Sequence, residues 1–243
     1  MWRRASWILA ASGALSATAL GQPLSPAQFI GLAASVVRVE ADREGRGVSV
    51  GSGVTVAPFT IATSCHVVRD ATGIRVAGSG TTWNVEGERA DTRHDLCFLR
   101  VPTWRGSPVR LSTEPAPHLG APVVAMGFTG GVHMAPRMGR IRAVHPFDGA
   151  SIIEADARFN SGSSGGGLFD SDGALIGLLT FRLRNSVESY YSIPVQWVRE
   201  QLPGEDEWTP VGPLQRTLPF WQAEGDEAPE FAWSRTGHAQ AER

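Results

Sequence analysis

The amino-acid sequence predicts an all-β protein, and three observations support this prediction. The chain of 243 residues contains 28 glycines and 16 prolines, which favour many tight turns. Short runs of β-branched and aromatic residues recur at spacings typical of β-barrels and β-sandwiches, and each run is bounded by Gly, Pro, Asp or Asn. Asp170-Ser171-Asp172-Gly173 stands between two apolar runs, which indicates a β-hairpin.

The predicted elements begin with a short helix. Ser25 is suited to the N-cap, Pro26 to the first turn, and Gln28 completes a capping box, so we expect a helix over Pro26–Ala34. The strands that we predict after it are Val36–Val39, Val48–Val56, Ile74–Ala77, Trp83–Glu86, Leu96–Val101, Val123–Met126, Ile141–Val144, Ile152–Glu154, Leu175–Phe181 and Tyr190–Ile193.

The chain after the last strand is predicted to form one helix and then a segment of different composition. Val195, Val198 and Leu202 recur at helical spacing and predict a helix over Pro194–Leu202. Residues 204–243 carry eight acidic and three basic residues, and they include Trp208, Trp221 and Trp233. Because disordered segments are poor in aromatic residues, we expect this acidic tail to be ordered in part, up to about Trp221. It is a disordered acidic tail, an arm that pins aromatic side chains onto the domain, or a docking arm for a partner, and we expect disorder near its end.

The first 21 residues are predicted to be a secretory signal peptide. Met1–Arg4 supplies positive charge, Ala5–Leu20 is apolar and rich in small residues, and cleavage is expected after Ala19 or Gly21. The alternative, a membrane anchor, needs about 20 strongly apolar residues. This stretch is shorter and is diluted by Ser, Thr and Gly. We therefore expect a periplasmic or secreted protein without stable membrane insertion, whose main domain covers residues 22–203.

Charge and cysteine content exclude several classes of protein. The formal net charge of −2 and the isoelectric point near 6.3 argue against a nucleic-acid-binding protein. Two cysteines are too few for a disulfide-rich small domain or a four-cysteine zinc site. No metal and no organic cofactor is predicted.

Three positions carry the residue types of nucleophilic catalysis. His66 follows an apolar run, Asp95 opens another, and Ser164 lies in a glycine-rich loop. A serine hydroxyl is a weak nucleophile that needs a neighbouring base, and histidine is the base suited to neutral pH. A carboxylate then fixes the histidine tautomer, and glycines let backbone N–H groups face a developing oxyanion.

Each of these residues also has an ordinary interpretation. The histidine alone is compatible with a satisfied polar side chain, the aspartate with a turn, and the serine with a linker. Gly162–Gly166 also fits the G-x-S-x-G nucleophile elbow of α/β-hydrolases. That fold requires the acid and the histidine after the serine, but only His238 follows Ser164. The elbow must also lead into a helix, whereas the residues after Gly165 predict a hairpin, so we reject this reading.

The flanking motifs resemble those of a known family. Thr63-Ser64-Cys65-His66-Val67, Asp95-Leu96-Cys97-Phe98-Leu99 and Gly162-Ser163-Ser164-Gly165-Gly166 are similar to the T-N-x-H-V, D-L-A-x-L and G-N-S-G-G patterns of the bacterial Deg/HtrA-like branch of trypsin-like serine proteases. Gly51–Val54 and Ile193-Pro194 match further landmarks of that family.

This resemblance covers about Ser35–Leu202. It implies two perpendicular six-stranded antiparallel β-barrels, with His66 and Asp95 in the first and Ser164 in the second. It also implies an oxyanion hole formed by the backbone N–H groups of Gly162 and Ser164. The chain after Leu202 does not resemble the PDZ module of that branch, so trimer assembly is not carried over and the oligomeric state is not predicted.

The two cysteines are predicted to form a disulfide beside the site. Cys65 precedes His66 and Cys97 lies two residues after Asp95, on the same face of an expected strand. If the histidine and the aspartate touch, the two sulfurs are neighbours. Two buried free thiols are the alternative, which an oxidising compartment disfavours.

The sequence says less about specificity. Arg158, six residues before Ser164, stands where the floor of the family's specificity pocket is usually found, or else it points outward or pairs with Asp156. The strand Thr180-Phe181-Arg182 is expected to pair with an extended protein or peptide substrate, and Phe181 either walls the pocket or belongs to the core. The function predicted is that of an exported serine endopeptidase, and the alternative is a catalytically silent binding module on the same fold.

Overall fold

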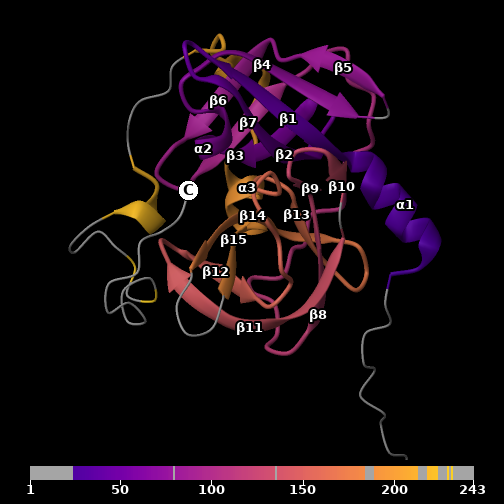
Figure 1. The fold of residues 1–243 in the computed structure, drawn as a ribbon. Coiled ribbons are helices and arrows are strands. Elements are labelled where there is room, and N and C mark those ends of the chain that lie inside the picture. The colour runs from indigo at the N-terminus through magenta and orange to yellow at the C-terminus, as the bar shows by residue number, and fades with distance from the viewer. Residues whose placement is uncertain are drawn as a thin grey trace, which may run out of the picture.

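The structure, a computed structural model, describes residues 24–78, 80–134, 136–183, 189–212 and 218–223, together with Pro229 and Phe231. Two β units are stacked on one another (Figure 1), and the all-β double-barrel prediction is confirmed. The predicted signal peptide and Trp233 lie outside the described residues.

The first unit is a curled sheet with the strand order β5-β4-β1-β2-β3-β7-β6. Its strands are β1 (Val36–Arg43), β2 (Gly47–Ala57), β3 (Thr60–Ser64), β4 (Ala71–Gly78), β5 (Thr81–Asn84), β6 (Gly87–Asp91) and β7 (Leu96–Arg100). In the described part of the chain it has seven strands in an open order, where the resemblance implied six in a closed barrel. We did not predict β3 or β6 as strands. β3 is buried along its whole length and so lacks the alternation that marks a strand, and β6 is mostly polar.

The second unit is a closed barrel of six strands in the order β11-β12-β15-β14-β13-β8, as expected. Its strands are β8 (Pro122–Met126), β11 (Arg137–Phe147), β12 (Ala150–Ala155), β13 (Gly167–Asp170), β14 (Leu175–Leu183) and β15 (Ser189–Pro194). The predicted turn at Asp170–Gly173 joins β13 to β14, and the Asp170 carboxylate accepts hydrogen bonds from the backbone N–H groups of Asp172 and Ala174. A small hairpin of β9 (Phe128–Thr129) and β10 (His133–Met134) extends from β8.

The helices are short and lie around the strands. They are α1 (Pro26–Ser35), α2 (Cys65–Val68) and α3 (Val195–Glu200), with single 3₁₀ turns η1 (Glu205–Glu207) and η2 (Phe220–Gln222). The capping box predicted for Ser25 and Gln28 is present at the start of α1. The closing helix is confirmed, although it is shorter than predicted.

The described part of the acidic tail packs onto both β units. Thr209 pairs with Glu88 of β6 through two backbone hydrogen bonds of 2.8 and 2.9 Å. Phe220 is buried beside Phe147 and Trp197. In Figure 1 the η2 turn lies beside the junction of the two units, and its Trp221 contacts His66 of α2.

Candidate active site

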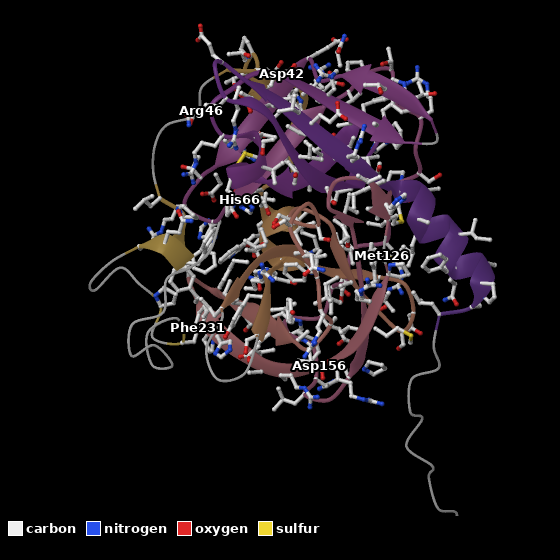
Figure 2. The ribbon with its side chains drawn as sticks, in the orientation of Figure 1. Asp42, Arg46, His66, Met126, Asp156 and Phe231 are labelled. Carbon is white, nitrogen blue, oxygen red and sulfur yellow. A yellow bond between two sulfur atoms is a disulfide. The ribbon has the colours of Figure 1, made fainter. Side chains whose placement is uncertain are left out.

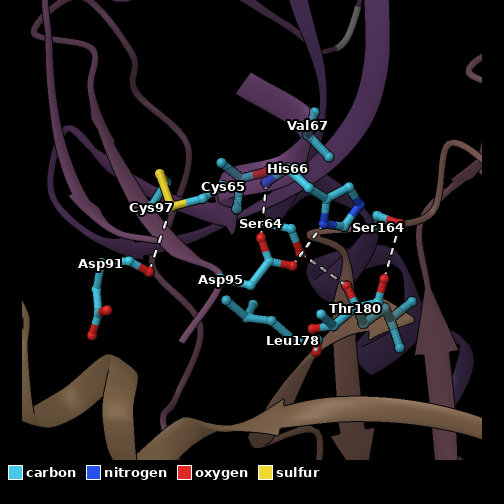
Figure 3. A network of polar contacts seen from close by, with 12 residues as sticks. Ser64, Cys65, His66, Val67, Asp91, Asp95, Cys97, Ser164, Leu178 and Thr180 are labelled. Atoms are coloured by element: carbon cyan, nitrogen blue, oxygen red, sulfur yellow. Dashed lines mark hydrogen bonds and ion pairs between the residues drawn. A yellow bond between two sulfur atoms is a disulfide. The ribbon is translucent and has the colours of Figure 1, made fainter. Parts of the chain in front are cut away.

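His66 and Asp95 are in direct contact at the junction of the two units (Figures 2 and 3). His66 lies in α2, directly after β3, and Asp95 is the last residue of the turn before β7. The ring nitrogen Nδ1 of His66 lies 2.6 Å from Oδ2 of Asp95, and the His66 backbone N–H donates to Oδ1 of the same carboxylate at 2.8 Å. Asp95 is fully buried, so its carboxylate holds both the ring and the backbone of His66.

The local backbone is built around this pair. Asp95 has φ +57°, in the left-handed region that few residues other than glycine adopt, and such strain persists where the surroundings enforce it. The predicted disulfide joins Cys65 to Cys97 and so ties α2 to β7. Arg43 donates hydrogen bonds to the carbonyl oxygens of His66 at 3.0 Å and Val67 at 3.3 Å, and burial lowers the pKa of its guanidinium.

His94 fixes the turn that carries Asp95. Its ring contacts the carboxylates of Asp91 and Asp148 and packs on Trp197, with ring centroids 4.0 Å apart. Burial alone would lower the pKa of His94, but the hydrogen bonds and charges of Asp91 and Asp148 outweigh it and raise the pKa above 6.5. The turn before Asp95 is therefore held by charged contacts on both sides of the imidazole.

Ser164 lies in the glycine-rich loop before β13 and faces the same cavity as His66. In the view of Figure 3 it stands on the side of the His66 ring away from Asp95. Its hydroxyl donates a hydrogen bond of 3.3 Å to the carbonyl oxygen of Thr180, and among the hydrogen bonds of the described residues it makes none with the ring. Rotation of χ1 to another staggered rotamer redirects the hydroxyl without any movement of the backbone.

The loop around Ser164 presents two backbone N–H groups that have no partner among the described residues. Gly162 has φ +90°, and a Cβ atom there would lie 2.4 Å from the carbonyl oxygen of Phe128, so only glycine fits. The carbonyl oxygen of Ser161 accepts a hydrogen bond of 2.8 Å from the N–H of Gly130. In a planar trans peptide the N–H points opposite to the carbonyl, so the Gly162 N–H points away from Gly130. Within the described part of the chain, neither this N–H nor that of Ser164 donates a hydrogen bond.

Ser52 of β2 connects this loop to the first unit. Its hydroxyl donates to the carbonyl oxygen of Gly162 at 2.7 Å and accepts from the N–H of Phe128 at 2.8 Å. Its own N–H donates to the carbonyl oxygen of Ser164 at 2.8 Å. The sequence identified Gly51-Ser52-Gly53 only as a motif of the family that it resembles. It did not indicate that the Ser52 hydroxyl contacts the loop that carries Ser164.

The cavity at the junction has a volume of about 350 Å³. The second unit and the tail line it with Phe159, Asn160, Ser161, Ser164, Thr180, Phe181, Arg182, Trp221 and Gln222, and the first unit lines it with Arg43, Arg46, Ser49, His66, Arg69 and Asp70. Four arginines against one aspartate give it a basic character. Thr180, Phe181 and Arg182 lie where the sequence analysis placed a substrate-binding strand.

Arg158 points outward, which is one of the alternatives that the sequence left open. It is exposed and does not line the cavity, while the next residue, Phe159, does. Along an extended segment consecutive side chains point to opposite sides, so the inward position falls to Phe159 and the arginine faces solvent. Asp156, the other partner considered for it, pairs with Arg142. The interpretation of Arg158 as the pocket floor is therefore wrong.

The edge of β14 beside Ser164 is open. β14 pairs with β15 over the stretch that includes Phe181 and Arg182. On its other edge it pairs with β13 only as far as Leu178, and Leu179 exchanges hydrogen bonds with Gly165 and Gly166. From Thr180 onward this second edge faces no strand among the described residues, so it can accept an added strand.

Among the described residues, no group of three or more His, Cys, Asp or Glu side chains could hold a metal ion. None of the helices in this part of the chain has the length and apolar character needed to cross a membrane.

With this geometry in hand, comparison with known proteins identifies the family. A family model described as a trypsin-like peptidase domain matches residues 51–178, and the chain belongs to that family. The matched region contains the three residues His66, Asp95 and Ser164, and it ends before Trp221.

Curated relatives match over part of the chain. The anti-sigma-I factor RsgI9 of Acetivibrio thermocellus is 32% identical over 154 residues, which is 62% of this chain and 22% of that protein. The serine protease Rv3671c of Mycobacterium tuberculosis is 27% identical over 67% of this chain and 43% of its own length. The serine endoprotease DegS of Salmonella typhimurium is 31% identical over 52% of this chain and 37% of its own. The chain thus spans less than half the length of each of these relatives.

Solved structures match the fold. The active form of the Rv3671c protease superposes with a TM-score of 0.67 at 23% identity, covering 84% of this chain and 95% of that one. A serine endoprotease from Yersinia pestis superposes with a TM-score of 0.66 at 27% identity, covering 74% of this chain and 66% of that one.

Proposed function

We propose that this protein is a serine endopeptidase that cleaves proteins or peptides with His66, Asp95 and Ser164. One observation carries the proposal: the buried carboxylate of Asp95 holds the His66 ring at 2.6 Å, and that ring lines the same cavity as Ser164. A base oriented in this way beside a serine is the arrangement that activates a hydroxyl nucleophile.

The reaction follows from the positions of these groups. Ser164 Oγ attacks the peptide carbonyl while His66 Nε2 takes its proton, and Asp95 stabilises the charged ring. The N–H groups of Gly162 and Ser164 stabilise the oxyanion. His66 then protonates the leaving amine, and water hydrolyses the acyl-enzyme by the same sequence in reverse.

We also propose that the protein is exported. The apolar N-terminal segment with its basic start supports this, and so does the Cys65–Cys97 disulfide, because disulfides persist in oxidising compartments.

The first experiment replaces the proposed nucleophile. Ser164→Ala removes only the hydroxyl, so the variant should fold with an unchanged circular dichroism spectrum. Its hydrolysis of an unfolded protein substrate should fall by a factor on the order of 10⁶, as when a triad nucleophile is removed. Ser171→Ala, in the distant β13–β14 turn, is the matched control and should cleave as the wild type does. Equal cleavage by Ser164→Ala would contradict the assignment.

The second candidate function is a catalytically silent binding module. One observation favours it: the Ser164 hydroxyl donates its hydrogen bond to the carbonyl oxygen of Thr180 and not to the His66 ring. Labelling with an organophosphate separates the two candidates, because only an activated serine reacts. If Ser164 is catalytic, the wild type is labelled at that residue and Ser164→Ala is not. An unlabelled wild type would favour the binding module.

A further inference from the structure

Trp221 of the acidic tail lies in the cavity that contains His66 and Ser164. Its ring stacks on Phe181, with centroids 5.0 Å apart and planes 11° from parallel. It also stands nearly perpendicular to the His66 ring, with centroids 5.8 Å apart and an angle of 83° between the planes. Although Trp221 lines the cavity, it is only 8% exposed. It comes from outside the region that matches the trypsin-like family model.

The neighbours of Trp221 hold it in this position. Phe220 is 2% exposed and packs against Phe147, Phe181 and Trp197. The Phe220 N–H donates a hydrogen bond of 2.8 Å to the carbonyl oxygen of Arg93, two residues before Asp95. A segment that opens easily has few buried apolar contacts, and this one has many. Trp221 is therefore a fixed part of the cavity wall.

The proposed path of the substrate runs past this wall. A peptide that adds to the open edge of β14 lies along Thr180–Arg182, with its scissile carbonyl at Ser164. In an extended strand consecutive side chains point to opposite sides. The side chain before the scissile bond enters the part of the cavity lined by Phe159 and Ser161. The side chain one residue earlier, called P2, then faces the opposite side, where His66, Phe181 and Trp221 meet.

We propose that Trp221 determines specificity by limiting the space for the P2 side chain, so that substrates with Gly or Ala at P2 are preferred. Trp221 covers the face of Phe181 and occupies the space beside the His66 ring, so a branched or aromatic P2 side chain has no room. This inference rests on the proposed peptidase function and assigns a binding role to a residue of the acidic tail.

The indole N–H of Trp221 simplifies the interpretation of a mutation at this position. This nitrogen is buried and has no hydrogen-bond partner among the described residues. Truncation of Trp221 therefore breaks no hydrogen bond of its side chain within that part of the chain, and the expected change in selectivity comes from the shape of the cavity alone.

The experiment measures kcat/KM for a series of peptides that are identical except for Gly, Ala, Leu or Phe at P2. The full-length wild type should prefer Gly and Ala. Trp221→Ala should raise the ratio of kcat/KM for Leu over Gly by about tenfold or more, which is the discrimination that steric fit of an apolar side chain usually gives. Trp221→Phe keeps a ring on Phe181, so it should shift the ratio in the same direction by a smaller factor, and it retains the test if the alanine variant does not fold.

Trp208→Ala is the matched control, because Trp208 belongs to the same tail but does not line the cavity. It should leave the selectivity ratio as in the wild type. If kcat/KM changes by the same factor for every peptide in the Trp221 variants, Trp221 acts as a general lid or support, and the inference is overturned while the proposed function stands. A wild type that cleaves no peptide and resists organophosphate labelling would overturn both.

Discussion

The two halves of the candidate site are held in place by different means. His66 and Asp95 belong to the same β unit, where one carboxylate makes two hydrogen bonds to His66 and a disulfide joins the neighbouring residues. Ser164 lies in a loop of the second unit whose orientation depends on hydrogen bonds from elsewhere. Ser52 of the first unit and Gly130 of the β9–β10 hairpin supply them.

This difference indicates how stability and catalysis should respond to mutation. The first half is fixed within its own unit by the Cys65–Cys97 disulfide. Loss of this disulfide should therefore lower the stability of the fold more than it disturbs the geometry of the His66–Asp95 pair. The second half is fixed by a few polar contacts, of which those of Ser52 come from the other unit, so loss of one contact should affect the geometry of the oxyanion donors more than global stability. The following predictions test that separation, beginning with the largest expected effect.

Removal of the disulfide should cost the most stability. Cys65 and Cys97 are separated by 32 positions, and closing a loop of that length stabilises a protein by about 3–4 kcal/mol in the chain-entropy model. The double variant Cys65→Ala/Cys97→Ala should lose about that much free energy of unfolding in urea titrations. Below the unfolding transition it should retain most of its kcat, because the Asp95 carboxylate still holds His66.

The wild type in a reducing agent is the control for this experiment, since it removes the cross-link without changing side-chain volume. A double variant that keeps its stability but loses kcat would contradict the separation, because the link would then position the catalytic pair and not the fold.

The sequence predicted the first half of the site better than the second. The motifs around His66 and Asp95 are local, and the disulfide follows from their expected contact and from the alternation of a strand. The serine loop could also be recognised, because Gly162 and Gly165 are needed for positive φ. What holds that loop could not be predicted, because Ser52 lies 110 residues before Gly162 and Gly130 lies in a hairpin that carried no strand signal.

The same reason explains what the sequence left open at the cavity. The count back from Ser164 could not decide whether Arg158 enters the pocket or points outward, because the inward position depends on the register of the chain against the barrel. The pairing of Thr180–Arg182 with a substrate was expected. The position of Trp221 was not, because it depends on how the tail packs back onto the domain, although the tryptophans had indicated that the tail is not simply disordered.

Ser52→Ala should have the next largest effect, and on catalysis more than on stability. The change leaves the Gly162 carbonyl and the Phe128 N–H, both at half-buried residues, without their side-chain partner, which favours rearrangement of the loop. Since loss of one oxyanion donor costs about 10²–10³ in kcat, partial misplacement should lower kcat by about 10–100-fold with a smaller change in KM.

The matched control is Ser35→Ala. Ser35 is also buried, and its hydroxyl also donates a hydrogen bond of 2.7 Å to a carbonyl, that of Ser107, but it lies at the end of α1. This variant should lose a similar amount of stability and keep its kcat. If both variants lose kcat equally, or neither does, Ser52 does not position the serine loop.

The smallest expected effect concerns Glu88, which attaches the acidic tail to the first unit. Its side chain accepts a hydrogen bond of 2.9 Å from the Gly212 N–H, and its other carboxylate oxygen is buried without a partner in the described part of the chain. Burial raises the pKa of Glu88 above 4.5, and the Gly212 N–H offsets this only in part. The folded state therefore binds a proton more readily than the unfolded state, so the contribution of Glu88 to stability is largest below pH 4.5 and decreases as the pH rises through its raised pKa.

Glu88→Gln should remove this pH dependence, because the amide keeps an acceptor for Gly212 and never ionises. A neutral group costs less to bury than a charge. At pH 7.5 the variant should melt about 2–4 °C higher than the wild type, which corresponds to roughly 1 kcal/mol for a domain of this size. At pH 4 the two melting temperatures should converge. Glu86→Gln changes an exposed carboxylate two residues earlier and should change neither value. A Glu88→Gln variant that melts at a lower temperature than the wild type at pH 7.5 would show that the ionised carboxylate stabilises the attachment of the tail. The tail, which carries Trp221, would then be held at the site by a charge, whereas the first half is held by a disulfide and the second half by hydrogen bonds.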